Sequence, residues 1–252
     1  MKNDFLIQKF TQCYEVQDFW KNRDHKWLDC SDIAGTNGYC DEEAAREIQR
    51  RMRSYPVDML HWIDGGNYHY ISRFWTDQIE TDFDLIVFDN HTDMQQSAFG
   101  DILSCGSWIR SVIERNKRLQ KVLLLGVRAD YAASLDGDVT ERVNCITTEE
   151  LQEKKGREKL QESLGRYPVY LSIDKDVLDP KVLRTDWDQG SMSYVLLETL
   201  LQQIIDGTNI IGADICGECA IDQPGAAKGI LQNDEINKCL LDFFSVTCFN
   251  DK

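Results

Sequence analysis

The sequence predicts an α/β fold in which helices cover both faces of a mainly parallel sheet. Short apolar runs alternate along the chain with stretches of helical spacing. Strands of a parallel sheet are buried on both faces and therefore appear in a sequence as continuous apolar runs. Their connecting helices lie on the two faces of the sheet. Acidic residues directly follow two of the runs, at the carboxyl ends of the predicted strands, where ligands bind in such sheets.

Five apolar runs are expected to form buried strands, and three segments are expected to form helices. The strands are residues 59–63, 85–88, 122–127, 169–173 and 210–215. The first helix runs from Asp41, an N-cap residue followed by acidic side chains, to a cluster of arginines before Pro56. Residues 193–206 have the apolar spacing of a packed helix with Gly207 placed to end it, and residues 233–248 are expected to form the last helix.

The composition indicates one domain with a sizeable core. The chain has 252 residues and no Pro/Ser-rich linker or internal repeat, so we expect a single domain over residues 1–252. Its formal charge of −15 disfavours nucleic acid and anionic membranes as partners, and suits metal cations and a small cationic substrate. Residues 1–10 lack the apolar segment of a signal peptide and no stretch is long enough to span a bilayer, which predicts a cytoplasmic protein.

Nine cysteines are scattered over the chain, and we expect most of them to be reduced thiols. The Cys216-x-x-Cys219 pair could be half of a zinc knuckle or a redox pair. No second Cys or His pair stands at ligand spacing in the sequence, so we favour two buried small residues.

Two acidic stretches follow predicted strands. One contains Asp89, His91 and Asp93, and the other contains Asp174 and Asp176. Alternate residues of an extended chain share a face, so we expect these donors to point together at the rim of the sheet. A single Asp at a strand end is usually a hydrogen-bond acceptor or a helix cap. Clustered like charges, however, are costly unless cations or protons neutralise them, and this cluster therefore predicts a divalent metal site.

The same stretches resemble motifs of the arginase/agmatinase (ureohydrolase) family. Residues 89–93 (DNHTD) resemble its Asp-x-His-x-Asp motif, and residues 172–180 (SIDKDVLDP) resemble its Ser-x-Asp-x-Asp-x-x-Asp-Pro motif. Two weaker matches, 64–69 (DGGNYH) and 212–218 (GADICGE), each differ in spacing from the family pattern. The resemblance covers about residues 60 to 220, and the first 55 residues match poorly. It implies a three-layer α/β/α sandwich with metals at the carboxyl edge of the sheet.

The resemblance also implies a binuclear manganese centre with two Mn(II) ions per chain. The implied ligands are Asp89 and Asp174 as bridges, His69 and Asp93 on one ion, and His91 and Asp176 on the other. A donor set of carboxylates and imidazoles without thiolates favours hard or borderline ions such as Mn(II). Two such ions lower the pKa of a shared water towards ~7.

Four further assignments follow. His69 is preferred to His61 as a ligand, because a Gly-Gly turn precedes it whereas His61 lies inside an apolar run. The resemblance makes Asp93 also the residue that holds the attacking water and carries its proton. It makes Glu218 the candidate for a two-point bond to a guanidinium or amidinium, with a surface or salt-bridging glutamate as the alternative. Lys175 alternates away from the neighbouring aspartates and is expected behind the site, in a buried ion pair.

The chain departs from arginases at two places. Arginases carry a histidine after the first metal motif that is thought to shuttle protons, but this chain has residues 104–108 (SCGSW) there. Either proton transfer proceeds through water and Asp93, or the leaving group differs. Residues 185–190 also lack the arginase sequence. Trp108 and Trp187 could wall a pocket for a flatter substrate or pack in the core.

Our leading hypothesis is a binuclear manganese-dependent hydrolase of a C–N bond in a guanidino, amidino or related amide compound. A mononuclear zinc amide hydrolase of the deacetylase type is an alternative, although those enzymes use histidine pairs near the metal and no His-His pair exists here. A metal-stabilised protein without turnover is a third reading, motivated by the missing shuttle histidine. A homo-oligomer is left open.

Overall fold

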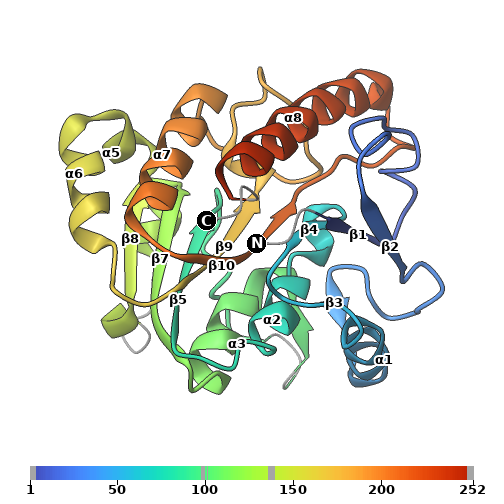
Figure 1. Ribbon diagram of the computed structural model, residues 1–252, viewed down its shortest axis with the longest axis horizontal. Coiled ribbons are helices and arrows are strands. Elements are labelled where there is room, and N and C mark those ends of the chain that lie inside the picture. Colours follow the sequence, from blue (N-terminus) through green and yellow to red (C-terminus); the bar gives the residue numbers. More distant parts are fainter. Residues whose placement is uncertain (1–3, 98–99, 101, 136–139, 249–252) are drawn as a thin grey trace.

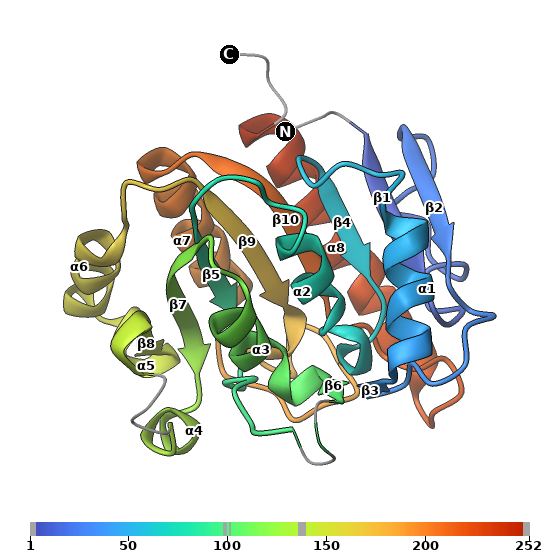
Figure 2. The same ribbon diagram turned by 90° about the horizontal axis from the view of Figure 1, so that it is seen from below.

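Helices cover both faces of an eight-stranded sheet in the computed structural model of the protein, which describes residues 4–97, 100, 102–135 and 140–248 (Figures 1 and 2). The strand order is β2-β1-β4-β10-β9-β5-β7-β8, and every pairing described between these strands is parallel. The strands are β1 (Phe5–Lys9), β2 (His25–Asp29), β4 (Leu60–Ile63), β5 (Phe83–Phe88), β7 (Leu119–Val127), β8 (Val143–Thr147), β9 (Val169–Asp174) and β10 (Ile210–Cys216). The short strands β3 (Tyr39–Cys40) and β6 (Leu103–Ser104) form a separate antiparallel pair. The predicted three-layer sandwich with a mainly parallel sheet is confirmed.

The two faces of the sheet carry separate apolar cores. The α-helices are α1 (Glu42–Met52), α2 (Ile71–Thr76), α3 (Trp108–Arg115), α4 (Ala129–Ala133), α5 (Thr148–Gln152), α6 (Lys154–Ser163), α7 (Tyr194–Gly207) and α8 (Ala226–Thr247). Successive residues of β5 point to opposite faces: Leu85 and Val87 pack with α1, α2 and α3, whereas Ile86 and Phe88 pack with α7 and α8. Within the described residues, none of the helices combines the length and apolar character needed to cross a bilayer.

The predicted elements are present, and several others were missed. All five predicted strands form, and Asp41 caps α1 by accepting a hydrogen bond from the backbone N–H of Ala44 at 2.8 Å. The last helix begins at Ala226, earlier than predicted. The strands β1, β2 and β8 were not predicted. In β1 only residues 5–7 form an apolar run before Gln8 and Lys9, yet the strand lies inside the sheet between β2 and β4.

Four adjacent strands, β4, β10, β9 and β5, end at one edge of the sheet (Figure 2). Asp174 is the last residue of β9. Asp64, Glu218 and Asp89 follow β4, β10 and β5 within two residues. The direct pairing of β5 with β9 brings the two acidic motifs together although they are far apart in sequence. This edge is where a parallel sheet binds its ligands.

Candidate metal centre

His69 reaches this edge through a glycine turn after β4. Asp64 follows the strand, and its carboxylate ties the turn to the end of β1 by accepting hydrogen bonds from the next backbone N–H and from two N–H groups just after β1, at 2.7–3.0 Å. Gly66 then begins a short 3₁₀ helix, Gly66–Tyr68. A Cβ on Gly66 would lie only 2.7 Å from Cδ1 of Trp187, so a residue with a side chain would displace the indole. His69 follows this helix and is buried.

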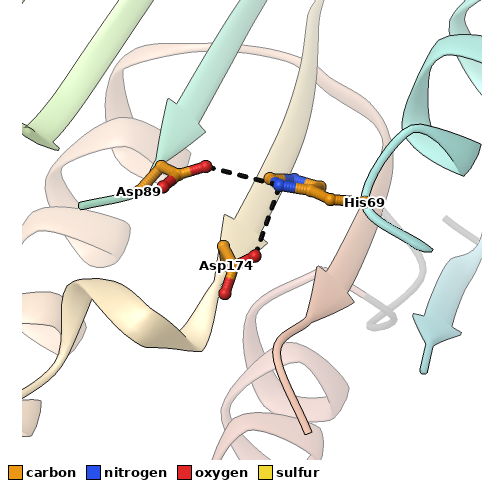
Figure 3. Close-up of side chains that lie close together, drawn as sticks. All are labelled: His69, Asp89 and Asp174. Atoms are coloured by element: carbon orange, nitrogen blue, oxygen red, sulfur yellow. Dashed lines mark ion pairs between the residues drawn. The ribbon is translucent and has the colours of Figure 1, made fainter. Parts of the chain in front are cut away.

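Three carboxylates face one nitrogen of His69. Its Nδ1 lies 3.3 Å from Oδ2 of Asp89, 3.2 Å from Oδ2 of Asp93 and 3.3 Å from Oδ2 of Asp174. Figure 3 shows Asp89 at the end of β5, Asp174 at the end of β9, and the imidazole pointing between them from the neighbouring loop. His69, Asp89 and Asp174 are spaced as a group that could hold a metal ion.

Asp89 also belongs to a second group, around His91. The Nδ1 of His91 lies 3.3 Å from Oδ1 of Asp89 and 2.9 Å from Oδ2 of Asp176. These three residues likewise could hold an ion. The two oxygens of Asp89 therefore face different imidazoles, which is how a carboxylate must lie to bridge two ions. The six ligands expected from the sequence thus lie together.

The donors converge through turns rather than through the extended alternation that we expected. Asp93 has φ of 47°, in the left-handed region that non-glycine residues rarely adopt. Asp176 lies in a 3₁₀ helix, Lys175–Val177, and its backbone N–H donates to Oδ1 of Asp174 at 3.0 Å. That part of the prediction was wrong, because both strands end before the motifs do.

The charges of the cluster decide which of its groups hold protons. Burial by itself lowers the pKa of His69, but the facing carboxylates raise it well above its usual range. The pKa of His91 is raised in the same way, by Asp176 and Asp89. Burial and the charge of Asp89 raise the pKa of Asp93 to about 6. In the protein alone, protons on the imidazoles therefore offset the crowded carboxylates.

The residues fit a metal ion for two reasons. First, Nδ1 of His69 and Oδ2 of Asp89 are buried and have no hydrogen-bond partner among the described residues, although they face each other at 3.3 Å. A cation between them would satisfy both atoms, which would otherwise carry a desolvation cost. Second, imidazoles and carboxylates without thiolates are the donors of a hard or borderline divalent ion such as Mn(II).

We expect the affinity of the cluster for a divalent ion to rise with pH. Because the carboxylates raise the pKa values of His69 and His91, both imidazoles keep a proton at neutral pH in the metal-free protein. An ion binds the neutral nitrogen, so each ion displaces about one proton, and Asp93 must lose another below its pKa of about 6. Calorimetric titration in buffers of different ionisation enthalpy counts these protons. An affinity that stays constant between about pH 6 and pH 8 would contradict the expectation.

The outer nitrogen of His69 is held by a buried polar chain that sequence reasoning missed. Nε2 lies 2.9 Å from Oγ of Ser172, and the Ser172 hydroxyl donates to Oδ1 of Asp214 at 2.7 Å. The hydroxyl of Tyr170 donates to the other oxygen of Asp214 at 2.8 Å. All of these side chains are buried, and they orient the ligand imidazole. His61, by contrast, lies in β4 and stacks on the ring of Trp75 from α2. It is a buried core residue, as expected.

Glu218 does not join the cluster but lies in a buried network behind it. Its carboxylate forms an ion pair with Lys175, and both side chains are at most 1% exposed. The Lys175 ammonium also donates to Oδ1 of Asn233 and Asn237 on α8 at 2.7 and 2.8 Å. The remaining oxygen of Glu218 accepts from Nε2 of Gln17 at 2.7 Å. The buried ion pair expected for Lys175 is present. Because both oxygens of Glu218 are occupied, this arrangement favours the salt-bridging alternative over a two-point bond to substrate.

A pocket of about 340 Å³ opens onto the cluster, and the two tryptophans play different parts in it. Trp187 lines the pocket, is 42% exposed and donates its indole N–H to Oδ1 of Asn67 at 3.1 Å. Trp108 is fully buried and donates its indole N–H to Oδ2 of Asp93 at 2.7 Å. Ser104 and Cys105, from the segment in which the sequence has no histidine, also line the pocket. Cys216 and Cys219 are free and buried, as expected.

Comparisons with known proteins agree with this geometry. The sequence profile of the arginase family matches residues 6–220, so the match begins well before residue 60, where we expected it to begin. The chain is 37% identical over 157 residues to an uncharacterized protein of Thermotoga maritima, across 62% of this chain and 57% of that protein. It is 31% identical over 137 residues to an agmatinase of Bacillus cereus, across 53% of this chain and 46% of the agmatinase. The matches span about half the length of these relatives.

The fold is similar to that of a solved formimidoylglutamase from Bacillus subtilis. The two structures superpose with a TM-score of 0.70 at 16% sequence identity, covering 100% of this chain and 89% of that one. The likeness includes β1 and β2.

Proposed function

The chain belongs to the arginase family, and on that premise we propose that it is a binuclear manganese-dependent hydrolase of a carbon–nitrogen bond. The substrate class that we propose is a small guanidino, amidino or related amide compound, because the similar proteins include an agmatinase and a formimidoylglutamase. The proposal rests on one observation: the two carboxylate oxygens of Asp89 face the imidazoles of two different residues, His69 and His91. A single zinc ion, as in the deacetylase-type alternative, would need only one such group.

Six residues would hold the two ions. We assign His69 and Asp93 to one ion, His91 and Asp176 to the other, and Asp89 to both. The family resemblance adds Asp174, whose Oδ2 faces His69, as the second shared ligand. When bound, the ions would lower the pKa of a water molecule that they share. Asp93 is our candidate for the group that would hold this water by a hydrogen bond and carry its proton. The bond from the indole of Trp108 keeps one oxygen of Asp93 in place, which leaves the other for this work.

The pocket suits a small, flat and cationic substrate. It has a volume of about 340 Å³, and the Trp187 indole forms part of its wall. A planar guanidinium or amidinium can stack on such a ring. We assign no substrate contact to Glu218. We further propose that residues 1–252 act as one domain, as a monomer or homo-oligomer, in the cytoplasm and without nucleic acid or membranes as partners.

The test is metal content together with hydrolysis. Protein produced with manganese should contain about two ions per chain by elemental analysis. It should release urea or ammonia from at least one member of a guanidino and amidino panel. A chelator should abolish this activity, and added Mn(II) should restore it. One equivalent of zinc with release of acetate from acetylated amines would instead favour the deacetylase-type alternative. A protein without any bound ion would exclude both.

A further inference from the structure

His91 has a partner on the side that faces away from the cluster. Its Nδ1 points at Asp89 and Asp176, whereas its Nε2 lies 2.9 Å from Oδ1 of Asp188. Asp188 belongs to residues 185–190, the segment that lacks the arginase sequence. The contact joins residues 97 positions apart, so no local pattern reveals it.

Asp188 is held in place although its side chain is 49% exposed. Its second oxygen, Oδ2, accepts a hydrogen bond from Nη1 of Arg128 at 2.7 Å and lies 3.3 Å from the hydroxyl of Tyr131. The Arg128 guanidinium lies 3.9 Å from the centre of the Tyr131 ring and also binds Asp130. The backbone carbonyl of Asp188 accepts from Nδ2 of Asn90, the neighbour of His91, at 3.0 Å. Hydrogen bonds to its side chain and to its backbone therefore both hold Asp188 in place.

This contact determines which nitrogen of His91 is free to bind an ion. An ionised carboxylate only accepts hydrogen bonds, so Nε2 keeps its hydrogen, and the proton that His91 gives up when it binds an ion is the one on Nδ1, towards the cluster. His69 has the same arrangement, with Nε2 on Ser172 and a carboxylate, Asp214, behind it. The two supports differ in burial, because Asp214 is fully buried whereas Asp188 lies at the rim.

We propose that Asp188, anchored by Arg128, is a positioning residue for His91 that sets the affinity of one ion of the pair. The inference rests on the proposed metal centre. Partners of this kind typically contribute about 10–100-fold to metal affinity. Since His91 is the ligand of only one ion, the effect is confined to that ion, and the ion on His69 keeps its own support from Ser172.

The experiment compares Asp188→Ala with a matched control. Asp130→Ala removes the other carboxylate that binds Arg128. The Asp130 side chain is exposed, like that of Asp188, but it does not contact His91 in the structure. Manganese binding to each purified protein is followed by calorimetric titration, and the coupling of the two ions by electron paramagnetic resonance. We expect the parent and Asp130→Ala to bind two ions and to give the spectrum of a coupled pair. We expect Asp188→Ala to bind one ion normally and the other about 10–100-fold more weakly, with an isolated-ion spectrum at one equivalent.

Two controls separate this role from a general effect on folding. Asp188→Asn keeps a neutral acceptor at the same place and should recover part of the lost affinity. The melting temperature of the metal-free Asp188→Ala protein should equal that of the parent. The inference is overturned if Asp188→Ala binds both ions as tightly as the parent, or if both ions weaken equally. A parent protein that binds no ion would instead overturn the metal centre itself.

Discussion

Asp89→Asn is expected to abolish binding of both ions and, with it, all metal-dependent hydrolysis. Asp89 is the residue shared by the two groups that could hold an ion, with one oxygen towards His69 and the other towards His91. An amide keeps the size of the side chain but loses its charge and one acceptor oxygen, so it cannot serve both ions as the carboxylate does. Elemental analysis and the guanidino and amidino panel measure the two effects.

The matched control is Asp84→Asn, at the opposite end of the same strand. Asp84 is also a buried carboxylate, and burial raises its pKa, but it lies at the amino end of β5, away from the cluster. This variant should bind two ions and hydrolyse the same compounds as the parent. If Asp89→Asn retained two ions, Asp89 would not be a bridge and the binuclear arrangement would be wrong.

Lys175→Met is expected to destabilise the protein by about 3–5 kcal/mol. The substitution leaves the carboxylate of Glu218 buried without its cation and removes the donor shared by Asn233 and Asn237. The network joins the ends of β9 and β10 to α8, so its loss should loosen the C-terminal helix from the sheet. Chemical denaturation of the metal-free protein measures the change in the free energy of unfolding.

A second substitution tests the explanation. Because a buried charge costs most when its partner is missing, Lys175→Met combined with Glu218→Leu should be more stable than Lys175→Met alone. The exposed pair Lys154–Glu158 serves as a comparison, and Lys154→Met there should leave the free energy of unfolding nearly unchanged. A Glu218→Gln protein of parental stability with a raised KM would show instead that Glu218 contacts the substrate.

The sequence alone predicted the layers of the fold and the place of the site. Continuous apolar runs identify strands buried on both faces, and the acidic motifs follow two of them, so their position at the carboxyl edge could be predicted. The strands β1 and β2, at one side of the sheet, were harder to predict. The apolar run of β1 covers only residues 5–7, and β2 has a half-exposed pattern, because burial at these positions comes from the neighbouring strands and helices.

Only the tertiary structure decided the partners of the side chains. Glu218 and Lys175 are both buried, and the pairing of β9 with β10 brings them together beneath α8, where they form an ion pair. Likewise, Asp188 contacts His91 directly, and Asp214 reaches His69 through the Ser172 hydroxyl, by hydrogen bonds that join distant segments. The pattern of apolar and polar residues around a position predicts its secondary structure and how deeply it is buried. Which charge a buried group meets depends on which strands lie side by side, and in this protein that is set by the order of the sheet.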